Sequence, residues 1–273
     1  MRQKQTIHYV NNMPLNEIVE WGKEEFEGNF ELKVTQYTKT LKANGEKYFF
    51  GDSPMDKMTF IFYQKMLKDS GGEVRDMNFN VSYYDFSGIQ FGERIEKCYS
   101  VDINSAYLTA LRNEKIITPE TFKYINEKTN KDKKLKMSRL KSVGMFAKNP
   151  IVINFEDGKV KEFSHEKSDL SWIFFTACKK TEDAMRICRL LLGQNYLFYW
   201  VDGIFMKENP EIIVKKLREL GLDSKIEIVE NLRVYKKSLI YNKDGVEKVL
   251  FLPQVNGEKV NNVKKEIGQY ITL

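Results

Sequence analysis

The stretch Lys-Cys-Tyr-Ser-Val-Asp-Ile-Asn-Ser-Ala-Tyr-Leu (97–108) decides which fold is expected. Its first seven residues are typical of a buried strand, and the residues that follow, up to Arg112, predict a helix with Ser105 near its cap. The strand therefore delivers Asp102 to a helix N-terminus. A carboxylate in that position can hold a divalent cation, while the backbone N–H groups of Ser105 and Ala106 point towards an anion such as a triphosphate.

A second carboxylate is expected at the tip of a hairpin. Residues 196 to 206 form an aromatic and aliphatic run that only Asp202-Gly203 interrupts, and this pattern predicts a tight β-turn. If this hairpin neighbours the strand that carries Asp102, then Asp102 and Asp202 can share two Mg²⁺ (or Mn²⁺) ions. This is the arrangement used for phosphoryl or nucleotidyl transfer. The residues alone leave an alternative open, because Asp at a strand end or in an Asp-Gly turn is often only a turn former.

The surrounding elements predict an α+β fold, with helices segregated onto an antiparallel sheet. Periodicity and turn residues predict helices at Asn16–Phe26, Met55–Lys68, Glu166–Gly193 with Ser168 as cap, and Pro210–Leu220; a strand at Phe30–Leu41 before an Asn44-Gly45 turn; and a hairpin of Asn231–Tyr241 with Val246–Pro253.

The positive charge is concentrated in one segment. The chain has 273 residues and a formal net charge of +6, and residues 112 to 148 hold eleven Lys or Arg against four Asp or Glu. This segment alone carries +7, so the other residues sum to −1. Such a block is either a solvated helix face or an electrostatic site for phosphates.

Composition excludes several classes of protein. Two His and three unclustered Cys cannot build a His- or Cys-rich zinc site, so we expect carboxylates to hold any catalytic metal. The odd number of Cys suggests reduced thiols and a cytoplasmic setting. Neither a signal peptide nor a transmembrane segment is expected, because the longest strongly apolar run, around residues 172 to 178, is far shorter than about 20 residues.

Residues 99–108, Tyr-Ser-Val-Asp-Ile-Asn-Ser-Ala-Tyr-Leu, resemble motif A of family B DNA polymerases, Asp-x-x-Ser-x-Tyr. The match falls on Asp102, Ser105 and Tyr107. The resemblance implies that Asp102 binds both metals, with Ile103 beside it, and that Tyr107 packs under the deoxyribose and selects against a 2′-hydroxyl. Asn104, Ser105 and Ala106 would contact the triphosphate. From the residues alone, Tyr107 is equally a core tyrosine.

The hairpin Tyr-Trp-Val-Asp-Gly-Ile-Phe (199–205) resembles motif C of the same family, usually Tyr-x-Asp-Thr-Asp-Ser-Ile-Phe. Asp202 aligns with the second Asp, which acts on the metals together with the motif A Asp. Trp200 replaces the first Asp, and Gly203 replaces Ser. The resemblance therefore implies that the essential carboxylate pair is kept.

Residues 136–144, Lys-Met-Ser-Arg-Leu-Lys-Ser-Val-Gly, resemble motif B, Lys-x-x-x-Asn-Ser-x-Tyr-Gly, less closely. The Lys-to-Gly spacing agrees, and a register shifted by one residue is an alternative. The resemblance implies that Lys136, Arg139 and Lys141 contact the incoming triphosphate and that Gly144 closes against the nascent base pair. At helical spacing we expect these basic residues to face one way.

Two shorter segments resemble loops that contact DNA in this family. Gly71-Gly72 matches a template-contact loop, with Asp69 where Tyr is usual, and Lys236-Lys237 matches a lysine-rich hairpin near the primer terminus. Two glycines are otherwise simply a turn, and lysines on an exposed strand are common. The resemblance covers residues 66 to 253 in the order of the family.

The resemblance implies a minimal DNA-directed DNA polymerase without proofreading, encoded by a phage, plasmid or similar element and acting in the bacterial cytoplasm. Its partners would be a DNA primer-template, deoxynucleoside triphosphates and a replication accessory protein, with no membrane. The fold would be a palm-type antiparallel sheet backed by helices, with a very short helical fingers insertion and little or no thumb. The expected segments are 1–65, of unknown role; 66–112, template loop and first palm segment; 113–142, short basic fingers; 143–253, palm; and 254–273, C-terminal tail.

Two other functions stay open on the sequence. Trp200 and the altered motif B are compatible with a non-catalytic, palm-derived module that binds nucleic acid or a replisome component. A two-metal nuclease is the third reading, although no clustered third acid is evident in the sequence. Reverse transcription is disfavoured as a variant of the first, because motif C lacks paired Asp residues.

Overall fold

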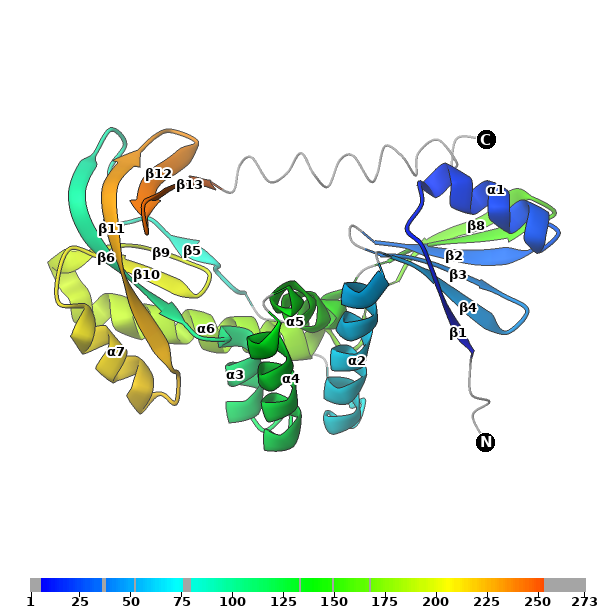
Figure 1. The fold of residues 1–273 in the computed structure, drawn as a ribbon, viewed down its shortest axis with the longest axis horizontal. Helices are drawn as coiled ribbons and strands as arrows, with labels where there is room; N and C mark the ends of the chain where they lie inside the picture. Colours follow the sequence, from blue (N-terminus) through cyan, green and yellow to red (C-terminus); the bar gives the residue numbers. More distant parts are fainter. Residues whose placement is uncertain are drawn as a thin grey trace. The chain divides into compact units, whose positions relative to one another are not determined.

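A computed structural model describes residues 6–35, 38–51, 53–75, 80–132, 134–148, 150–166 and 168–252, with backbone only for 53–56 (Figure 1). The expected tail at 254–273 lies outside these residues. No helix in the described part of the chain is long and apolar enough to cross a membrane. Cys98, Cys178 and Cys188 are all buried, and none is paired in a disulfide.

The described chain divides into two compact units, each made of two separate sequence segments. The first unit takes in residues up to Val74 and then Lys123–Ser171, and the second takes in Arg75–Phe122 and the described residues from Trp172 onwards. This division differs from the segments expected from the sequence. The region 1–65 shares its unit with residues far along the chain, and the basic segment 113–142 is divided after Phe122.

The first unit is built on a six-stranded sheet. Helix α1 (Leu15–Glu25) packs on one face, where Ile18 meets Leu32, Leu41 and Ile153 in a buried cluster (Figure 1). Helices α2 (Ser53–Asp69) and α5 (Leu135–Gly144) pack against each other, and α4 (Pro119–Lys131) enters this unit from the second. The strand order is β1 (Ile7–Val10), β4 (Glu46–Phe50), β3 (Lys39–Ala43), β2 (Phe30–Val34), β7 (Ile151–Glu156) and β8 (Lys159–His165), antiparallel except for β1 with β4.

The second unit is built on a seven-stranded antiparallel sheet. Helices α6 (Ser171–Leu192) and α7 (Pro210–Glu219) lie against it, and α3 (Ala106–Asn113) continues from its central strand (Figure 1). The strand order is β13 (Val246–Phe251), β12 (Ser238–Lys243), β11 (Ser224–Val234), β6 (Arg94–Ile103), β10 (Gly203–Met206), β9 (Tyr196–Trp200) and β5 (Tyr84–Asp85). The α+β class expected from the sequence is confirmed.

Strand β6 lies in the middle of the sheet, and both of its faces are covered. On one face Val101 and Ile204 pack against Met185 of α6 and Leu217 of α7. On the other face Cys98 and its cross-strand neighbours form a second apolar cluster, which includes Phe198, Phe205, Val229 and Leu239. Successive side chains of a strand point to opposite faces, so Asp102 lies on the face of Cys98 rather than on the face of the helices.

Most expected elements are present, with three local corrections. The strand expected over Asn231–Tyr241 is the end of β11, a turn and then β12, and it is β12 that pairs with β13. The single strand expected over Phe30–Leu41 is two antiparallel strands, β2 and β3, which pair through Val34 and Lys39. The Asn44-Gly45 turn is confirmed, since both residues have the positive φ angles (51° and 79°) that a type I′ turn requires. Helix α6 starts at Ser171, later than expected, and Ser168 caps only the turn before it, where its Oγ accepts the Leu170 N–H at 3.3 Å.

Candidate active site

Asp102 and Asp202 come together at one end of the seven-stranded sheet. Asp102 is the second-last residue of β6 and pairs across the sheet with Gly203, the first residue of β10. The Ile103 N–H donates a 2.9 Å hydrogen bond to the Asp202 carbonyl oxygen. The two backbones are therefore directly bonded at this point, although 100 residues of chain separate them.

Gly203 leaves room for the Asp102 carboxylate. A Cβ built on Gly203 would collide with Asp102 Oδ1, so no larger residue fits here without movement of the aspartate. Gly203 directly follows Asp202 and begins β10, so Oδ1 of Asp102 is directed towards the start of β10, next to the turn that holds Asp202. Glycine at position 203, where the motif that this hairpin resembles has Ser, thus has a steric explanation.

The hairpin turn is displaced by one residue from its expected place. Trp200 pairs with Gly203, so the two central residues are Val201 and Asp202 rather than Asp202 and Gly203. Val201 has φ 56°, a left-handed conformation that is rare for a β-branched residue. Its N–H donates to the Tyr83 carbonyl oxygen at 2.6 Å, which helps to hold this strained turn and with it Asp202.

Two residues that the sequence did not indicate complete the surroundings of Asp102. Lys243, the last residue of β12, donates from Nζ to Asp102 Oδ2 at 3.2 Å and also contacts Glu227 of β11. Glu227 further contacts Lys225, and Ser100 Oγ lies 3.5 Å from Glu227 Oε2. A third carboxylate and an ammonium group therefore lie at the same end of the sheet as the expected pair.

The ionisation of these carboxylates is shifted in opposite directions. Burial raises the pKa of Asp102, a hydrogen bond with Glu227 raises it further, and Lys243 acts against both. Burial also opposes ionisation of Glu227, but its hydrogen bonds with Asp102, Lys225 and Lys243 outweigh burial and lower the pKa of Glu227. Without a further cation, Asp102 is the group of this pair that holds a proton more readily.

Tyr107 is within electrostatic reach of the second carboxylate. It is in the first turn of α3, half-buried, with its ring 6.0 Å from that of Phe174 in an edge-on contact. Burial is the largest cause of its raised pKa; a hydrogen bond with the Cys178 thiol and the negative charge of Asp202 add to it. The residue expected to act as a steric gate thus lies within electrostatic reach of Asp202, and it also packs as a core residue does.

The helix start expected to bind triphosphate is partly used within the fold. Ser105 is the N-cap of α3 with a left-handed backbone (φ 54°) and makes no side-chain capping bond. The Asn104 N–H donates to the Asp223 carbonyl oxygen at 2.8 Å, and the Ile103 N–H is bonded to Asp202 as described above. The N–H groups of Ile103 and Asn104 are thus bonded within the fold, and triphosphate contact by Asn104, Ser105 and Ala106 stays a prediction.

The basic residues expected to contact triphosphate, Lys136, Arg139 and Lys141, belong to α5 of the first unit, and they do not face one way as expected. Lys136 is exposed, whereas Arg139 is only 9% exposed and its Nη1 donates to Asn126 Oδ1 of α4 at 3.3 Å. Lys141 is half-buried, and Gly144 ends the helix with open space around it. Arg139 is therefore turned towards α4, where it holds two helices together.

The two expected DNA-contact loops are both turns. Gly71 and Gly72 follow α2 with φ 68° and 65°, the left-handed conformation that glycine adopts most readily. Lys236 and Lys237 are exposed but lie between β11 and β12, not on a strand. Strand β11 runs from Ser224, near Asp102, to Val234, so this turn is roughly 30 Å along the strand from the carboxylates. DNA contact stays a prediction for both.

Trp200 has an aromatic environment. Its ring stacks on that of Tyr84 with 5.7 Å between centroids, and Phe86 lies 6.0 Å away. It pairs with Gly203, which pairs in turn with Asp102, so Trp200 lies on the carboxylate face two strands from Asp102. Trp200 is thus part of an aromatic cluster rather than a polar one.

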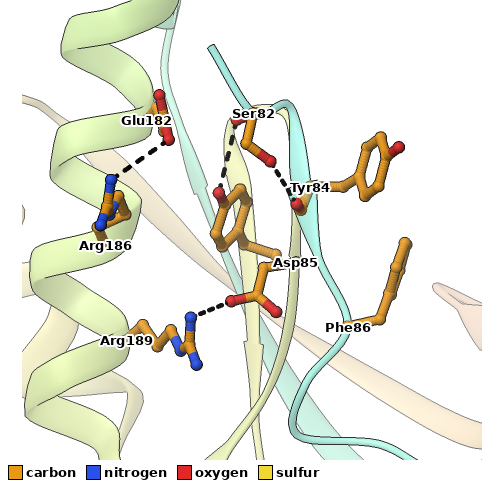
Figure 2. Close-up of a pocket in the computed structure, with 8 residues that line it drawn as sticks. Ser82, Tyr84, Asp85, Phe86, Glu182, Arg186 and Arg189 are labelled. Atoms are coloured by element: carbon orange, nitrogen blue, oxygen red, sulfur yellow. Dashed lines mark hydrogen bonds and ion pairs between the residues drawn. The ribbon is translucent and has the colours of Figure 1, made fainter. Parts of the chain in front are cut away.

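A pocket of about 430 Å³ lies on the other face of the sheet, between β5 and α6 (Figure 2). Its charged groups are paired with one another: Arg189 with Asp85, and Arg186 with Glu182 at 3.8 Å (Figure 2). Tyr199 closes one side and reaches the Ser82 carbonyl oxygen at 3.5 Å. None of the candidate carboxylates lines this pocket.

Comparisons with known proteins add no family. No protein-family model matches the chain, and no curated protein matches it. Among the residues that the structure describes, no group of three or more His, Cys, Asp or Glu side chains is arranged to hold a metal ion. The case for a site therefore rests on the geometry around Asp102 and Asp202.

Proposed function

We propose that the protein is a divalent-metal-dependent nucleotidyltransferase that synthesises DNA on a DNA template, as a minimal relative of family B polymerases without proofreading. The observation that carries the proposal is the hydrogen bond between the Ile103 N–H and the Asp202 carbonyl oxygen, with Asp102 lying against Gly203. This junction sets Asp102, near the end of β6, next to the turn that holds Asp202, and β6 leads directly into a helix.

The donor chemistry of this junction fits Mg²⁺ or Mn²⁺. Both ions prefer hard oxygen ligands, and Asp102, Asp202 and the Ile103 carbonyl supply only oxygen. When bound, the metal would polarise the phosphate and lower the pKa of the attacking hydroxyl. The residues would then have separate roles: the two aspartates would hold the cation, and Tyr107, within electrostatic reach of Asp202, would form the wall against which a sugar packs.

Primer extension tests the proposal. The full chain should add deoxynucleotides to a DNA primer-template only with Mg²⁺ or Mn²⁺. Asp102→Asn and Asp202→Asn should each lower the rate on the order of 100-fold or more, because each removes charge stabilisation at the reacting phosphate. Asp244→Asn, in the exposed β12–β13 turn, is the matched control and should act like the unaltered chain. Full activity in either site variant would refute the mechanism.

The same site also favours a second candidate, a two-metal nuclease. Glu227 is a third acid beside Asp102, and nucleases of this type recruit additional carboxylates. Degradation of end-labelled DNA with metal but without nucleotides would identify this activity, and Glu227→Gln should abolish it. Nucleotide addition without degradation would exclude it.

A non-catalytic nucleic-acid-binding module is the third candidate. It is favoured by Lys243, which engages Asp102, and by Trp200 in place of a carboxylate. Such a module would bind primer-template DNA with strong salt dependence and incorporate no nucleotide under any metal condition. Primer extension identifies the polymerase, and the degradation assay without nucleotides then distinguishes the nuclease from the non-catalytic module.

A further inference from the structure

We propose that Lys243 is a built-in competitor of the divalent cation: its ammonium group occupies the cation position between Asp102 and Glu227 and must withdraw before metal binds. This inference rests on the proposed function, because it concerns Asp102, one of the two aspartates proposed to bind metal, and it adds Glu227 as a neighbouring carboxylate. It assigns a role to a strand-end lysine that no motif of the sequence marks.

The reach of Lys243 is the first argument. It lies on β12, pairs with Val229 of β11 and extends across that strand to Asp102 on β6. Its Nζ lies 3.2 Å from Asp102 Oδ2 and in contact with Glu227 Oε2, so one ammonium group bridges two carboxylates from two strands. A bridging position between carboxylate oxygens is also the position that a divalent cation takes.

The burial of this cluster is the second argument. The Glu227 side chain is 12% exposed, that of Lys243 is 21% exposed and that of Asp102 is 26% exposed. Charges that are largely removed from water interact more strongly than surface charges, so a divalent ion cannot enter beside the ammonium group without a large repulsion. Entry of the metal and departure of Lys243 are therefore coupled.

The position of Lys243 allows it to leave. It precedes the Asp244-Gly245 turn and keeps part of its side chain exposed, so a rotation of its flexible four-carbon stem brings Nζ into water without movement of the sheet. Glu227 then keeps Lys225 as a partner. The site thus has a metal-free state stabilised by Lys243 and a metal-bound state in which Asp102 and Glu227 face the divalent cation.

Direct measurement of Mn²⁺ binding tests this inference independently of catalysis. The full chain is titrated with Mn²⁺, and free Mn²⁺ is quantified by electron paramagnetic resonance. Lys243→Gln should lower the Kd for Mn²⁺ about tenfold, because it removes the competing charge. Lys243→Arg keeps the charge and should not tighten binding. Lys248→Gln makes the same charge change on the exposed strand β13 and serves as the matched control.

The outcomes separate this inference from the proposed function. Tighter Mn²⁺ binding by Lys243→Gln that disappears when Asp102→Asn is added supports the competitor role, even in a chain that extends no primer. Unchanged or weaker binding by Lys243→Gln, with its circular dichroism spectrum intact, overturns it, even in a chain that is an active polymerase. If Lys248→Gln lowers the Kd for Mn²⁺ as much as Lys243→Gln does, the effect comes from the change in net charge alone. This result would also overturn the competitor role of Lys243.

Discussion

At the scale of single residues, the candidate site depends on the absence of one side chain. Gly203 has neither a turn role nor a positive φ, and its requirement for glycine comes from Asp102 Oδ1, which fills the space of a Cβ. The charged groups nearby also depend on close neighbours. Burial acts against the charge of both Glu227 and Lys243, but hydrogen bonds with Asp102, Lys225 and Lys243 lower the pKa of Glu227, and contacts with Glu227 and Asp102 raise the pKa of Lys243. A small change at Gly203 therefore acts directly on the aspartate.

We expect Gly203→Ala to impair the site and the fold together. The added methyl group must displace the Asp102 carboxylate or separate β6 from β10, at a cost of about 1–3 kcal/mol in the free energy of unfolding. Metal-dependent activity should fall as well. Urea denaturation measures the first effect, and primer extension measures the second.

Gly144→Ala is the matched control for stability, because nothing lies within 4 Å of a Cβ at Gly144 and this residue is helical. It should be neutral or slightly stabilising. A Gly203→Ala variant as stable and as active as the unaltered chain would show that Asp102 does not depend on this contact.

At the scale of elements, the basic residues of helix α5 lie in two different environments, one exposed to solvent and one buried against α4. Lys136 and Arg139 are one helical turn apart, yet one is exposed and the other is turned towards Asn126 of α4. The hairpin β9–β10 shows a similar compromise, since it accepts a left-handed Val201 and thereby sets Asp202 at its tip. In both cases packing overrides the local preference.

We expect substitutions at Lys136 and Arg139 to have different consequences. Arg139→Ala should destabilise the fold by about 1–3 kcal/mol, because it leaves Asn126 without this buried partner. Lys136→Ala should change stability by no more than about 0.5 kcal/mol, as is usual for an exposed residue. If Lys136 contacts triphosphate, its loss should raise the KM for nucleotide.

Thermal denaturation and steady-state kinetics separate the two effects. Glu120→Ala, at an exposed position in the first turn of α4, is a suitable reference for a change of surface charge. An unaltered KM in Lys136→Ala would remove this residue from the nucleotide site, and an unaltered melting temperature in Arg139→Ala would contradict its structural role.

At the scale of the whole molecule, the two units are interleaved in sequence. Strand β2 lies between β3 and β7, and β7 comes from residues more than one hundred positions later. The stacked pair of Phe30 and Phe155, with ring centroids 4.4 Å apart, joins these two segments in the core. The first unit is therefore completed only after residues 75–122 of the second have been made.

We expect a fragment of residues 1–74 not to fold by itself. It lacks β7 and β8, so it exposes one edge of β2 and removes Ile153 and Phe155 from the core around Ile18. Circular dichroism and the dispersion of its amide NMR spectrum would measure this. Cooperative unfolding with native-like dispersion would show that β7 is dispensable.

The local sequence predicted elements whose signals lie within a few residues. The strand and helix around Asp102, the Asn44-Gly45 turn and the helix before Gly221 all follow from periodicity and turn chemistry. The proximity of Asp102 to Asp202 was predictable only as a hypothesis, because it required two strands to be neighbours. Their adjacency is a property of the sheet order.

Only the tertiary structure decided what surrounds that pair. Glu227 and Lys243 lie near Asp102 because of how β11 is aligned with β6 and β12 with β11. The spacing of residues along the chain does not predict the alignment of one strand with another. The burial of Arg139 likewise depends on α4. Short-range patterns specify strands, helices and turns because they act through the local backbone, whereas the ionisation and access of the carboxylates depend on side chains brought together from more than one hundred residues away.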